Sequence, residues 1–338
     1  MARLSAGERE FLLSCRSFAE FGFPKSNAAA FALLAYQSAW FKKYYPAEFY
    51  CAPLNAQPMG FYPPHVLTND AQRHGIEVLA PDVNRSGGRC TVEEGAIRVG
   101  FAYVQGIGEE GARALEEERR RNGVFRSLSD FVWRVGLKRE PIENLIQVGA
   151  FDQFGLNRRE LLWQLGLLYR PSNGLLALPL PVEQDMVALP EMTDWERMAA
   201  DYGILALSPH YHPMGLMRPH LHKGIVSTAH LERLSDGTQV EVAGLVVCRQ
   251  QPMTAKGFVF LLLEDEFGMA NVVVKPQLYE RYRSLVRAEP FVLVSGELQR
   301  RDGTTNVIAG ALGALPIRPP LRTPQAHNFG LQKEETPK

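Results

Sequence analysis

Three glycines at the start of a helix-forming run are the residues that first indicate chemistry. The run reads VQGIGEEGARALEEER over 104–119, with glycines at Gly106, Gly108 and Gly111. Glycine is a poor helix former, but it adopts positive φ and lets a backbone approach a ligand closely. The first amides of a helix have no partner within it and lie at the positive end of its dipole. The pattern predicts a hairpin that binds phosphate without reading a base; a tight turn between packed elements is the alternative.

A second hairpin is predicted by the stretch GAFDQFGLNRRELL, which follows a helix expected over Pro141–Val148. Asn157 is a typical N-cap residue, and Arg158 and Arg159 fall in the first turn of the next helix. Two hairpins in tandem can hold two backbone segments of one duplex, with the arginines adding charge to the amide sites. The alternative is that these arginines form an ordinary solvated helix face.

The segment 238–316 is rich in β-forming residues and is predicted to be a small barrel. It contains five such runs, and an amphipathic helix over Gln277–Arg287 lies between the third and the fourth. Five strands with a helix after the third is the order of an OB-fold. Barrels of this kind bind single strands across strands two and three, with the loops between strands one and two and between four and five as clamps.

Both expected clamp loops are basic. Their cations are Arg249, Lys256, Arg300 and Arg301. The second strand also offers Phe258 and Phe260, which would stack bases if they point outward and fill the core if they point inward. We expect the core position for both, and therefore a modest affinity of the barrel for single strands.

Other groups with the potential for chemistry lack the partners that they would need. The histidine pairs HYH and HLH have no cysteine or carboxylate cluster beside them, so no metal site is expected. The acidic run Glu264–Glu266 lies between two predicted strands and is expected to shape a turn. No Walker-type phosphate loop is present. The sequence therefore predicts neither a catalytic residue nor a metal ligand.

Composition limits the remaining classes of function. The chain has 338 residues, enough for two or three domains, and 37 basic side chains balance 37 acidic ones. Any nucleic-acid surface must therefore be local. The four cysteines form no CxxC pair, no apolar run reaches the length of a membrane span, and the N-terminus lacks the form of a signal peptide. We expect a cytoplasmic protein with reduced thiols and no membrane partner.

The elements that would position these groups follow from the sequence pattern. Residues 1–50 read as helical, and the proline-rich stretch from Pro171 to Pro190 reads as a linker. Further helices are expected at Glu109–Arg121, Ser127–Val135, Pro141–Val148 and Asn157–Leu168. The fold class is thus α+β and multidomain, with a mostly helical first half, tandem helix-hairpin-helix motifs and a five-stranded OB-fold barrel.

Several longer stretches resemble one family in the same order along the chain. The segment FAEFGFPKSNAAAFALLAYQSAWFKKYYPAEFYCAPLNAQPMGFYPP resembles the late fingers of the bacterial C-family DNA polymerases, the family of the DNA polymerase III alpha subunit. The stretch NAQPMGFYPPHVLTNDAQRHGIEVLAPDVNRS resembles the error-prone branch, which works in damage tolerance. VGAFDQFGLNRR, LSPHYHPM and TAKGFVFLLLEDEFGMANVVVKP are similar to that branch too. The resemblance extends from Phe18 to Leu315.

The resemblance implies a domain order. The expected parts are the end of the polymerase fingers at 1–80, tandem helix-hairpin-helix motifs at 81–170, a linker and connector at 171–237, the OB-fold at 238–316 and a flexible tail at 317–338. The family's palm, with its metal-binding aspartates, would lie upstream of these parts. The resemblance thus implies a fragment, a split gene product or a trimmed chain, without catalytic residues or a cofactor of its own. Mg²⁺ is expected only in the palm.

The function implied is that of the DNA-binding, C-terminal portion of an error-prone, translesion DNA polymerase, a nucleotidyltransferase. Its partners would be template–primer duplex, single-stranded template, the rest of the polymerase and damage-tolerance accessory proteins. One alternative is a non-catalytic nucleic-acid-binding accessory or scaffold protein. Another is a helical module whose hairpins pack against protein rather than DNA.

Two departures from the family pattern bear on binding. In the family, the motif Gly-Phe-(Asn or Pro)-(Lys or Glu)-Ser is followed by His, and here it is followed by Asn27. Lys25 stays a candidate contact to an incoming triphosphate, with a plain surface lysine as the alternative. The clamp-binding peptide of replicative members ends in an aromatic anchor, which the stretch Gln184–Val187 lacks. Weak or no direct binding to the sliding clamp is therefore expected.

Overall fold

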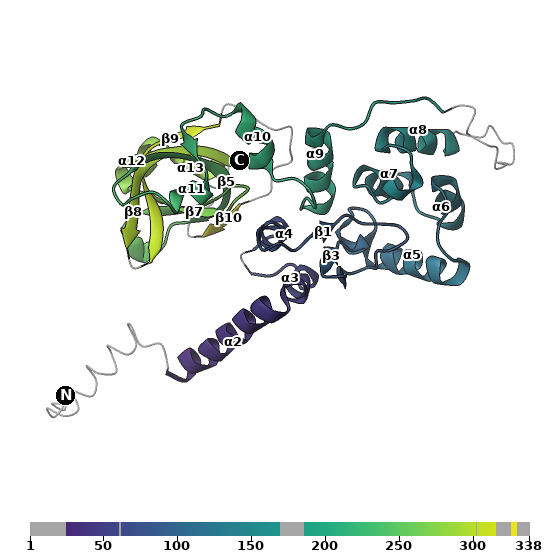
Figure 1. Ribbon diagram of the computed structural model, residues 1–338, viewed down its shortest axis with the longest axis horizontal. Helices are drawn as coiled ribbons and strands as arrows, with labels where there is room; N and C mark the ends of the chain where they lie inside the picture. Colours follow the sequence, from purple (N-terminus) through teal and green to yellow (C-terminus); the bar gives the residue numbers. More distant parts are fainter. Residues whose placement is uncertain (1–24, 61, 170–185, 302, 316–325, 330–338) are drawn as a thin grey trace, which may run out of the picture. The chain divides into compact units, whose positions relative to one another are not determined.

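The computed structural model describes residues 25–60, 62–169, 186–301, 303–315 and 326–329, and the chain divides into two compact units, 1–49 and 50–338. The first unit contains α2, Lys25–Tyr44, and the start of α3, Pro46–Asn55 (Figure 1). Large apolar side chains, among them Leu34, Tyr36 and Tyr44, are exposed on α2. At 3.6 residues per turn they spread around more than half of the helix circumference. α2 therefore has no polar face that would suit it to solvent.

The second unit begins with a short helix and a small sheet. Its elements are α4 (Pro64–Arg73), β1 (Val78–Leu79), β2 (Thr91–Glu93), β3 (Ala96–Arg98) and η1 (Phe101–Tyr103). β3 is the central strand, parallel to β1 and antiparallel to β2. Glu94 and Gly95, with φ of 51° and 84°, make the turn between β2 and β3. This sheet leads through η1 directly into the first predicted hairpin.

Four helices and a short 3₁₀ turn follow around one apolar core. They are α5 (Gly108–Asn122), α6 (Leu128–Arg134), α7 (Arg139–Gln147), η2 (Asp152–Phe154) and α8 (Arg158–Leu168). Their positions confirm the four helices expected from the sequence to within two residues at each end. Phe125, Phe131 and Phe151 pack edge to face at the centre of this core, with ring centroids 4.8 Å and 5.0 Å apart. The core fixes both hairpins relative to each other.

A connector of short elements leads to the barrel. It consists of α9 (Asp194–Leu205), α10 (Pro213–Met217), η4 (Arg218–His220), β4 (Ile225–Val226) and α11 (Thr228–Leu231). α9 begins with a capping box, in which Thr193 and Glu196 bond each other's backbone amides. Leu205 and Leu207 extend the core of the hairpin helices. The expected linker falls largely on residues 170–185, outside the described part.

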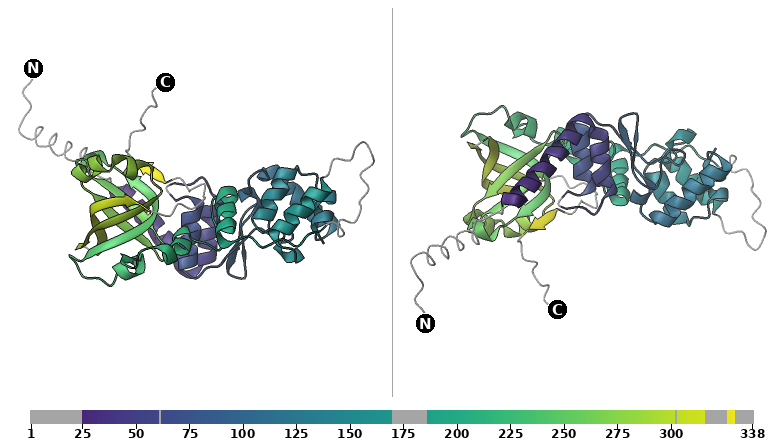
Figure 2. Two further views of the ribbon diagram at one scale, coloured as in Figure 1. Left: turned by 90° about the horizontal axis from the view of Figure 1, so that it is seen from above. Right: turned by 90° about the horizontal axis from the view of Figure 1, so that it is seen from below.

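The last part is a closed barrel with the connectivity expected of an OB-fold. Its elements are β5 (Gln239–Gln250), η5 (Met253–Ala255), β6 (Val259–Glu264), β7 (Met269–Val274), α12 (Pro276–Arg281), α13 (Arg283–Ala288), β8 (Phe291–Arg301) and β9 (Thr304–Ala314), with β10 (His327–Phe329) added beside β5. The sheet runs β5–β6–β7–β9–β8 and closes through β5–β8. Only β7 and β9 pair in parallel among these five strands. Figure 2 shows the strands, in green and yellow, curving around one interior.

Two local features of the barrel differ from a simple reading of its pattern. The single helix expected over Gln277–Arg287 is two short helices, because Tyr282 leaves helical geometry between them. The β8–β9 register shifts between Ser295 and Gly296. A side chain at Gly296 would collide with the carbonyl of Ile308, so glycine is required at this bulge. The bulge bends β8 and so helps the barrel to close.

Over the ranges that the structure describes, no helix combines the length and the apolar character needed to cross a bilayer.

Candidate nucleic-acid interface

The first hairpin is an exposed turn built on two left-handed glycines. Gly106 and Gly108 have φ of 88° and 64°, and both are exposed, whereas Ile107 between them is buried in the helical core. A Cβ at Gly106 would lie 3.3 Å from the ring of Pro141 in α7. Glycine therefore serves two needs at Gly106: a positive φ and a close approach to α7. The turn is packed on one side and open to solvent on the other.

The N-terminus of α5 is left without a side-chain cap. Ile107 occupies the N-cap position and makes no side-chain hydrogen bond there. Gly108, Glu109 and Glu110, which carry the first amides of the helix, are all exposed. These amides are therefore free to bind an anion. The two glutamates favour the helix dipole and oppose such an anion, so the site should be weaker than that of an uncharged turn.

Gly111 has a different role from the other two glycines. It is half-buried within α5, and a Cβ there would lie 3.2 Å from Cγ2 of Ile107 and 3.8 Å from Leu137. Its small size lets the start of α5 pack against the turn. The structure thus places Gly111 in the packing of the hairpin and not on the exposed turn.

The second hairpin is closed by its own side chains. Oδ1 of Asn157 accepts hydrogen bonds from the amides of Arg159 and Glu160, both at 3.0 Å. Glu160 in turn accepts a hydrogen bond from the amide of Asn157 at 3.1 Å. This is a complete capping box. The amides expected to bind phosphate here already have protein partners.

Arg158 lies in the core of this hairpin, in contrast to its predicted place beside a phosphate. Its side chain is only 7% exposed; it bonds both carboxylate oxygens of Asp152, and Nη1 donates to the carbonyl of Gln147 at 2.7 Å. A side chain at Gly149 would collide with the guanidinium. The prediction of a DNA contact is replaced by a structural one. The guanidinium instead fills the space beside Gly149 and bonds Asp152 and Gln147 of the same hairpin.

Arg159 points elsewhere and is partly exposed. Its Nη2 donates to Glu196 of α9 at 2.6 Å. An exposed ion pair of this kind contributes little to stability, so the guanidinium is able to exchange Glu196 for another anion. Arg159 is therefore the arginine of this hairpin that remains compatible with a phosphate contact.

Two of the four predicted barrel cations are structural. Arg249 is 4% exposed and donates to the carbonyls of Val286 and Glu289 at 2.7 Å and 2.6 Å. Burial lowers the pKa of Arg249 to about 10. Arg300 donates to three backbone carbonyls at the end of α11 and in the turn after it. Both side chains tie loops to the barrel. Arg249 is too deeply buried to clamp a single strand, whereas Arg300 is exposed and its predicted contact stays a prediction.

The other two predicted cations are exposed at the ends of the barrel loops. Lys256 follows η5 with a φ of 48°, and Arg301 ends β8. Within the described ranges, neither side chain makes an ion pair or a hydrogen bond. Both side chains are thus open to a ligand, and their contact to a single strand stays a prediction. The side chain of Lys25, the predicted triphosphate contact at the start of α2, lies outside what the structure describes.

Phe260 points away from the barrel interior, contrary to the core position expected for it. It is 37% exposed, while its neighbours Val259 and Leu261 are buried. It stands opposite Val273 of β7 and Gln250 of β5. An exposed aromatic ring on strand two of an OB-fold is suited to stack on a base. Phe258, just before β6, is half-buried.

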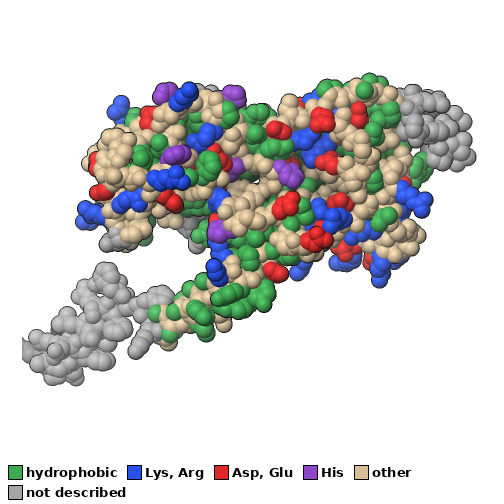
Figure 3. All heavy atoms as spheres, viewed as in Figure 1, with side chains coloured by type: hydrophobic (Ala, Val, Ile, Leu, Met, Phe, Trp, Pro, Cys, Tyr) green, Lys and Arg blue, Asp and Glu red, His purple; other side chains and the backbone are tan. Residues whose placement is uncertain are grey.

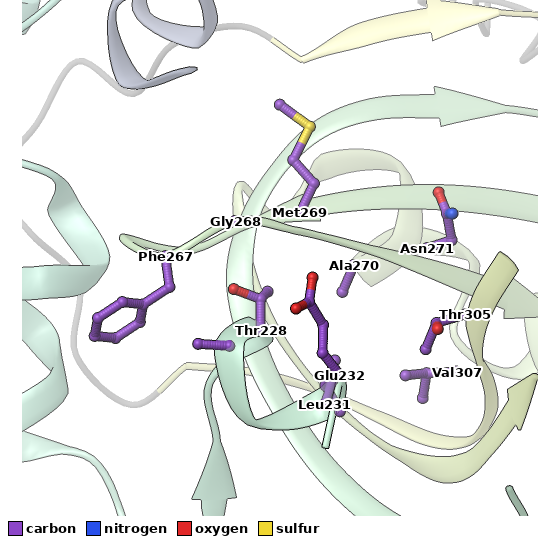
Figure 4. Close-up of a pocket in the computed structure, with 11 residues that line it drawn as sticks. Thr228, Leu231, Glu232, Phe267, Gly268, Met269, Ala270, Asn271, Thr305 and Val307 are labelled. Atoms are coloured by element: carbon purple, nitrogen blue, oxygen red, sulfur yellow. The ribbon is translucent and has the colours of Figure 1, made fainter. Parts of the chain in front are cut away.

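A small pocket of about 200 Å³ lies on the barrel between α11, β7 and β9 (Figure 4). Among the residues lining this pocket, Glu232 alone is charged, and Figure 4 shows its carboxylate directed toward β7. Asn271 and Thr305 add neutral polar groups. A lone carboxylate repels phosphate, so this pocket is not part of a backbone-binding surface.

The acidic run after β6 holds the local structure together. Asp265 accepts hydrogen bonds from the amides of Phe267 and Gly268, which confirms its expected role in the turn. Glu264 is fully buried and accepts from Asn69 and Arg73 of α4 at 3.1 Å and 2.8 Å. These carboxylates are therefore engaged by protein donors.

The histidine pairs also have structural partners. Nδ1 of His212 accepts a hydrogen bond from the amide of Met214 and so caps α10, and Nδ1 of His222 accepts one from Gly224. In the part of the chain that the structure describes, no three His, Cys, Asp or Glu side chains gather as a metal site.

Sequence reasoning missed a group of arginines beside the first hairpin. Arg85 and Arg89 come from the loop before β2, and Arg113 and Arg119 from α5. Arg89 and Arg113 are 24 positions apart in the sequence, so their approach depends on the fold. Figure 3 shows Lys and Arg side chains mixed with acidic ones in this part of the molecule. The only local signal was the motif RSGGR, two arginines flanking a glycine pair.

Comparison with known families identifies both modules. Residues 75–161 match the family described as helix-hairpin-helix motif, and residues 240–312 match an OB-fold nucleic acid binding domain. The two matches cover the open hairpin and the closed barrel described above. Both modules thus belong to classes of nucleic-acid-binding domain.

Sequence relatives extend over nearly the whole chain. The error-prone DNA polymerase of Anaeromyxobacter dehalogenans is 41% identical over 329 residues, which are 94% of this chain and 29% of that protein. The enzyme of the same name from Corynebacterium efficiens is 42% identical over 303 residues, 89% of this chain and 28% of that protein. The chain thus spans less than a third of the length of these relatives. A solved asparaginyl-tRNA synthetase from Pyrococcus horikoshii, at 20% identity, covers 28% of this chain and 23% of its own, with a TM-score of 0.25.

Proposed function

The chain is a relative of the bacterial error-prone DNA polymerases, and we propose that it is a DNA-binding portion of such an enzyme, acting in damage tolerance. The observation that carries the proposal is the uncapped, exposed N-terminus of α5 behind the glycines of the first hairpin. A helix-hairpin-helix motif presents its open amides in this way. Phosphates of a duplex backbone are the ligand that such amides fit.

The first hairpin binds template–primer duplex through the sugar–phosphate backbone. The amides of Gly108 and Glu109 supply the donors, and Arg159 of the second hairpin adds a charge once it leaves Glu196. Contacts to phosphate carry no sequence information. Affinity is therefore insensitive to base sequence and falls steeply with salt, by about 0.9 in log K per phosphate contact and decade of salt.

The barrel binds the single-stranded template beside the duplex. Lys256 and Arg301 are the exposed cations of its two loops, and Phe260 offers a ring for stacking. One stacked base contributes about 1–3 kcal/mol. With a single exposed ring on strand two and two free cations, the affinity of the barrel for single strands is modest.

The described residues offer no place for the chemistry of nucleotide transfer. Two-metal catalysis needs carboxylates fixed a few ångströms apart and open to metal. Glu264 and Asp265 are buried and engaged by protein donors, and no other metal-ligand cluster exists among the described residues. The described residues therefore do not fit Mg²⁺. The relatives, being more than three times as long, have room for a palm elsewhere.

α2 provides the contact to the rest of the polymerase. Leu33, Leu34 and Trp40 are exposed on it, and a helix that is apolar over most of its circumference is stable only when it is covered. Polypeptide that the longer relatives contain is the natural cover. Accessory proteins and the sliding clamp stay predictions, because Gln184 and Asp185 of the degenerate clamp peptide lie outside the described residues.

Primer extension and duplex binding together test the function. The chain is titrated into a fluorescent template–primer at 50–200 mM salt, with two unrelated base sequences, and its affinity for both should be equal. Alone it should not extend the primer, and a palm-containing partner should restore extension. Nucleotide incorporation by the chain alone, or no duplex binding at 50 mM salt, would contradict the proposal.

A further inference from the structure

A cleft of about 590 Å³ lies between α5 and the loop that precedes β2. Six of its eleven lining residues are charged. They are Arg85, Arg89, Arg113, Arg119, Glu109 and Glu116. Four arginines against two glutamates leave a local excess of positive charge, in a chain whose net formal charge is zero. This cleft is therefore a place where an anion would be concentrated.

A pair of glycines forms the wall of the cleft. A Cβ at Gly87 would lie 3.1 Å from Oε1 of Glu116, and one at Gly88 would lie 3.4 Å from Cβ of Ala112. The carbonyls of both glycines accept hydrogen bonds from the amides of η1, at 2.8 Å and 2.9 Å. The loop thus fits closely against α5 and is held there by backbone bonds. The cleft is a fixed feature of the fold and does not depend on one side-chain rotamer.

Two of the four arginines are free to bind a ligand. The carboxylate of Glu116 accepts a hydrogen bond from the amide of Gly88. Arg85 forms an ion pair with Glu93 at 3.0 Å. Arg119 donates to the carbonyl of Val83 at 3.0 Å. These three side chains therefore already have protein partners.

Arg89 and Arg113 are both exposed, and within the described ranges neither makes an ion pair or a hydrogen bond. Their guanidinium groups, with five donors each, suit phosphate oxygens in geometry as well as charge.

The cleft adjoins the open end of α5. Glu109 of the first turn is among its lining residues. At 1.5 Å per residue, Arg113 lies about 7.5 Å along the helix from Gly108. This matches about two base-pair steps of 3.4 Å along the axis of a duplex. A backbone that is held at the amides of α5 therefore passes Arg113 next.

We propose that this cleft is a second phosphate site, in which Arg89 and Arg113 bind the backbone of the DNA strand held at the first hairpin. The inference rests on the proposed function and extends its contact surface. A free nucleotide is a poorer fit, because none of the eleven lining residues is aromatic and a base would have no ring to stack on. A strand backbone needs only charge and donors.

The test is the double variant R89Q/R113Q of the full chain, titrated with a 20-base-pair duplex at 50–400 mM salt. Each lost phosphate contact should lower the slope of log K against log salt by about 0.9, and so lower affinity at 0.1 M about eightfold. The double variant should show a slope smaller by about 1.8 and an affinity lower by roughly 60-fold. Unchanged circular dichroism and melting temperature show that it folds.

The matched control is R121Q/R126Q, which removes the same charge from exposed arginines that do not line the cleft. Arg121 lies about 12 Å along α5 from Arg113, beyond the Debye length at 0.1 M salt. The affinity of R121Q/R126Q for the duplex should stay near that of the wild type. An equal loss in both double variants would reduce the effect to net charge and overturn the proposal.

The remaining outcomes separate the two proposals. If the wild type binds duplex and R89Q/R113Q keeps its slope and affinity, the cleft is not a phosphate site, while the hairpin proposal stands. If the wild type fails to bind duplex, both fail. If R89Q/R113Q loses binding of dATP or pyrophosphate but not of duplex, the cleft takes free phosphates instead of a strand, and the proposal is overturned.

Discussion

Replacing Asp201 by asparagine should stabilise the protein above neutral pH. Asp201 lies in α9, 3% exposed, and one carboxylate oxygen accepts a hydrogen bond from Oγ of Ser208 at 2.6 Å. Burial raises the pKa of Asp201 to about 7, against the opposing effects of Ser208 and of nearby Arg158. An asparagine carbonyl accepts the same hydrogen bond without the cost of burying a charge.

The direction of this pH dependence of stability follows from proton linkage. The unfolded carboxyl loses its proton near its ordinary pKa of 3.8, whereas the folded one keeps it until about pH 7. The stability that this group contributes is therefore fully present below pH 3.8 and is lost as pH rises to 7. The shift is about three units, and one unit corresponds to about 1.4 kcal/mol. The gain of D201N over the wild type should thus be near zero at pH 4 and reach up to about 4 kcal/mol at pH 8.

Denaturant unfolding followed by tryptophan fluorescence measures this difference. All four tryptophans precede residue 238, so the signal reports mainly the helical part, although Trp195 of α9 also packs against the apolar cluster that includes Leu245 and Phe291 of the barrel. S208A is the matched comparison: loss of the hydroxyl raises the folded pKa further, so its stability should continue to fall above pH 7. A D201N gain that is the same at pH 4.5, 6 and 8, or a D201N protein less stable than wild type at pH 8, would refute the reasoning.

Three further predictions concern the hairpins and the barrel. G149A should unfold at a lower denaturant concentration, because a φ of 85° costs an L-residue about 1–2 kcal/mol and the added methyl group would collide with Arg158. G155A, with a φ of 79° and open space around it, should lose only the stability that the backbone conformation costs. E109Q/E110Q should raise duplex affinity in low-salt anisotropy titrations by up to about tenfold, since each charge about 6 Å from a phosphate costs about 0.7 kcal/mol in water; an unchanged affinity would place the duplex elsewhere. F260A should weaken binding of single-stranded DNA by about 1–3 kcal/mol without changing the melting temperature, and equal binding would show that no base stacks on this ring.

The barrel was predictable because its signals are local. Five β-rich runs with turn residues between them, and a helix after the third, leave few alternatives. The break of that helix at Tyr282 was not foreseeable, since it depends on how two short helices cover the barrel. The outward position of Phe260 was foreseeable from strand alternation once Val259 and Leu261 are taken as core.

The roles of individual arginines could not be predicted in the same way. The sequence shows that Arg158, Arg249 and Arg300 are basic residues near turns, but their hydrogen bonds depend on partners from other elements. The carbonyls that hold Arg300 belong to residues more than sixty positions earlier. Arg89 and Arg113 have no distinctive sequence context, yet the fold brings both to the lining of one cleft.

The difference between the two hairpins would affect the residence time of the protein on DNA. Asn157 and Glu160 cap the N-terminus of α8, whereas the N-terminus of α5 has no side-chain cap. With only one open helix N-terminus, the protein contacts fewer phosphates than it would with two. Fewer phosphate contacts release fewer counterions, so the protein dissociates from DNA sooner. If the proposed function holds, the protein would therefore stay bound to a duplex end only briefly.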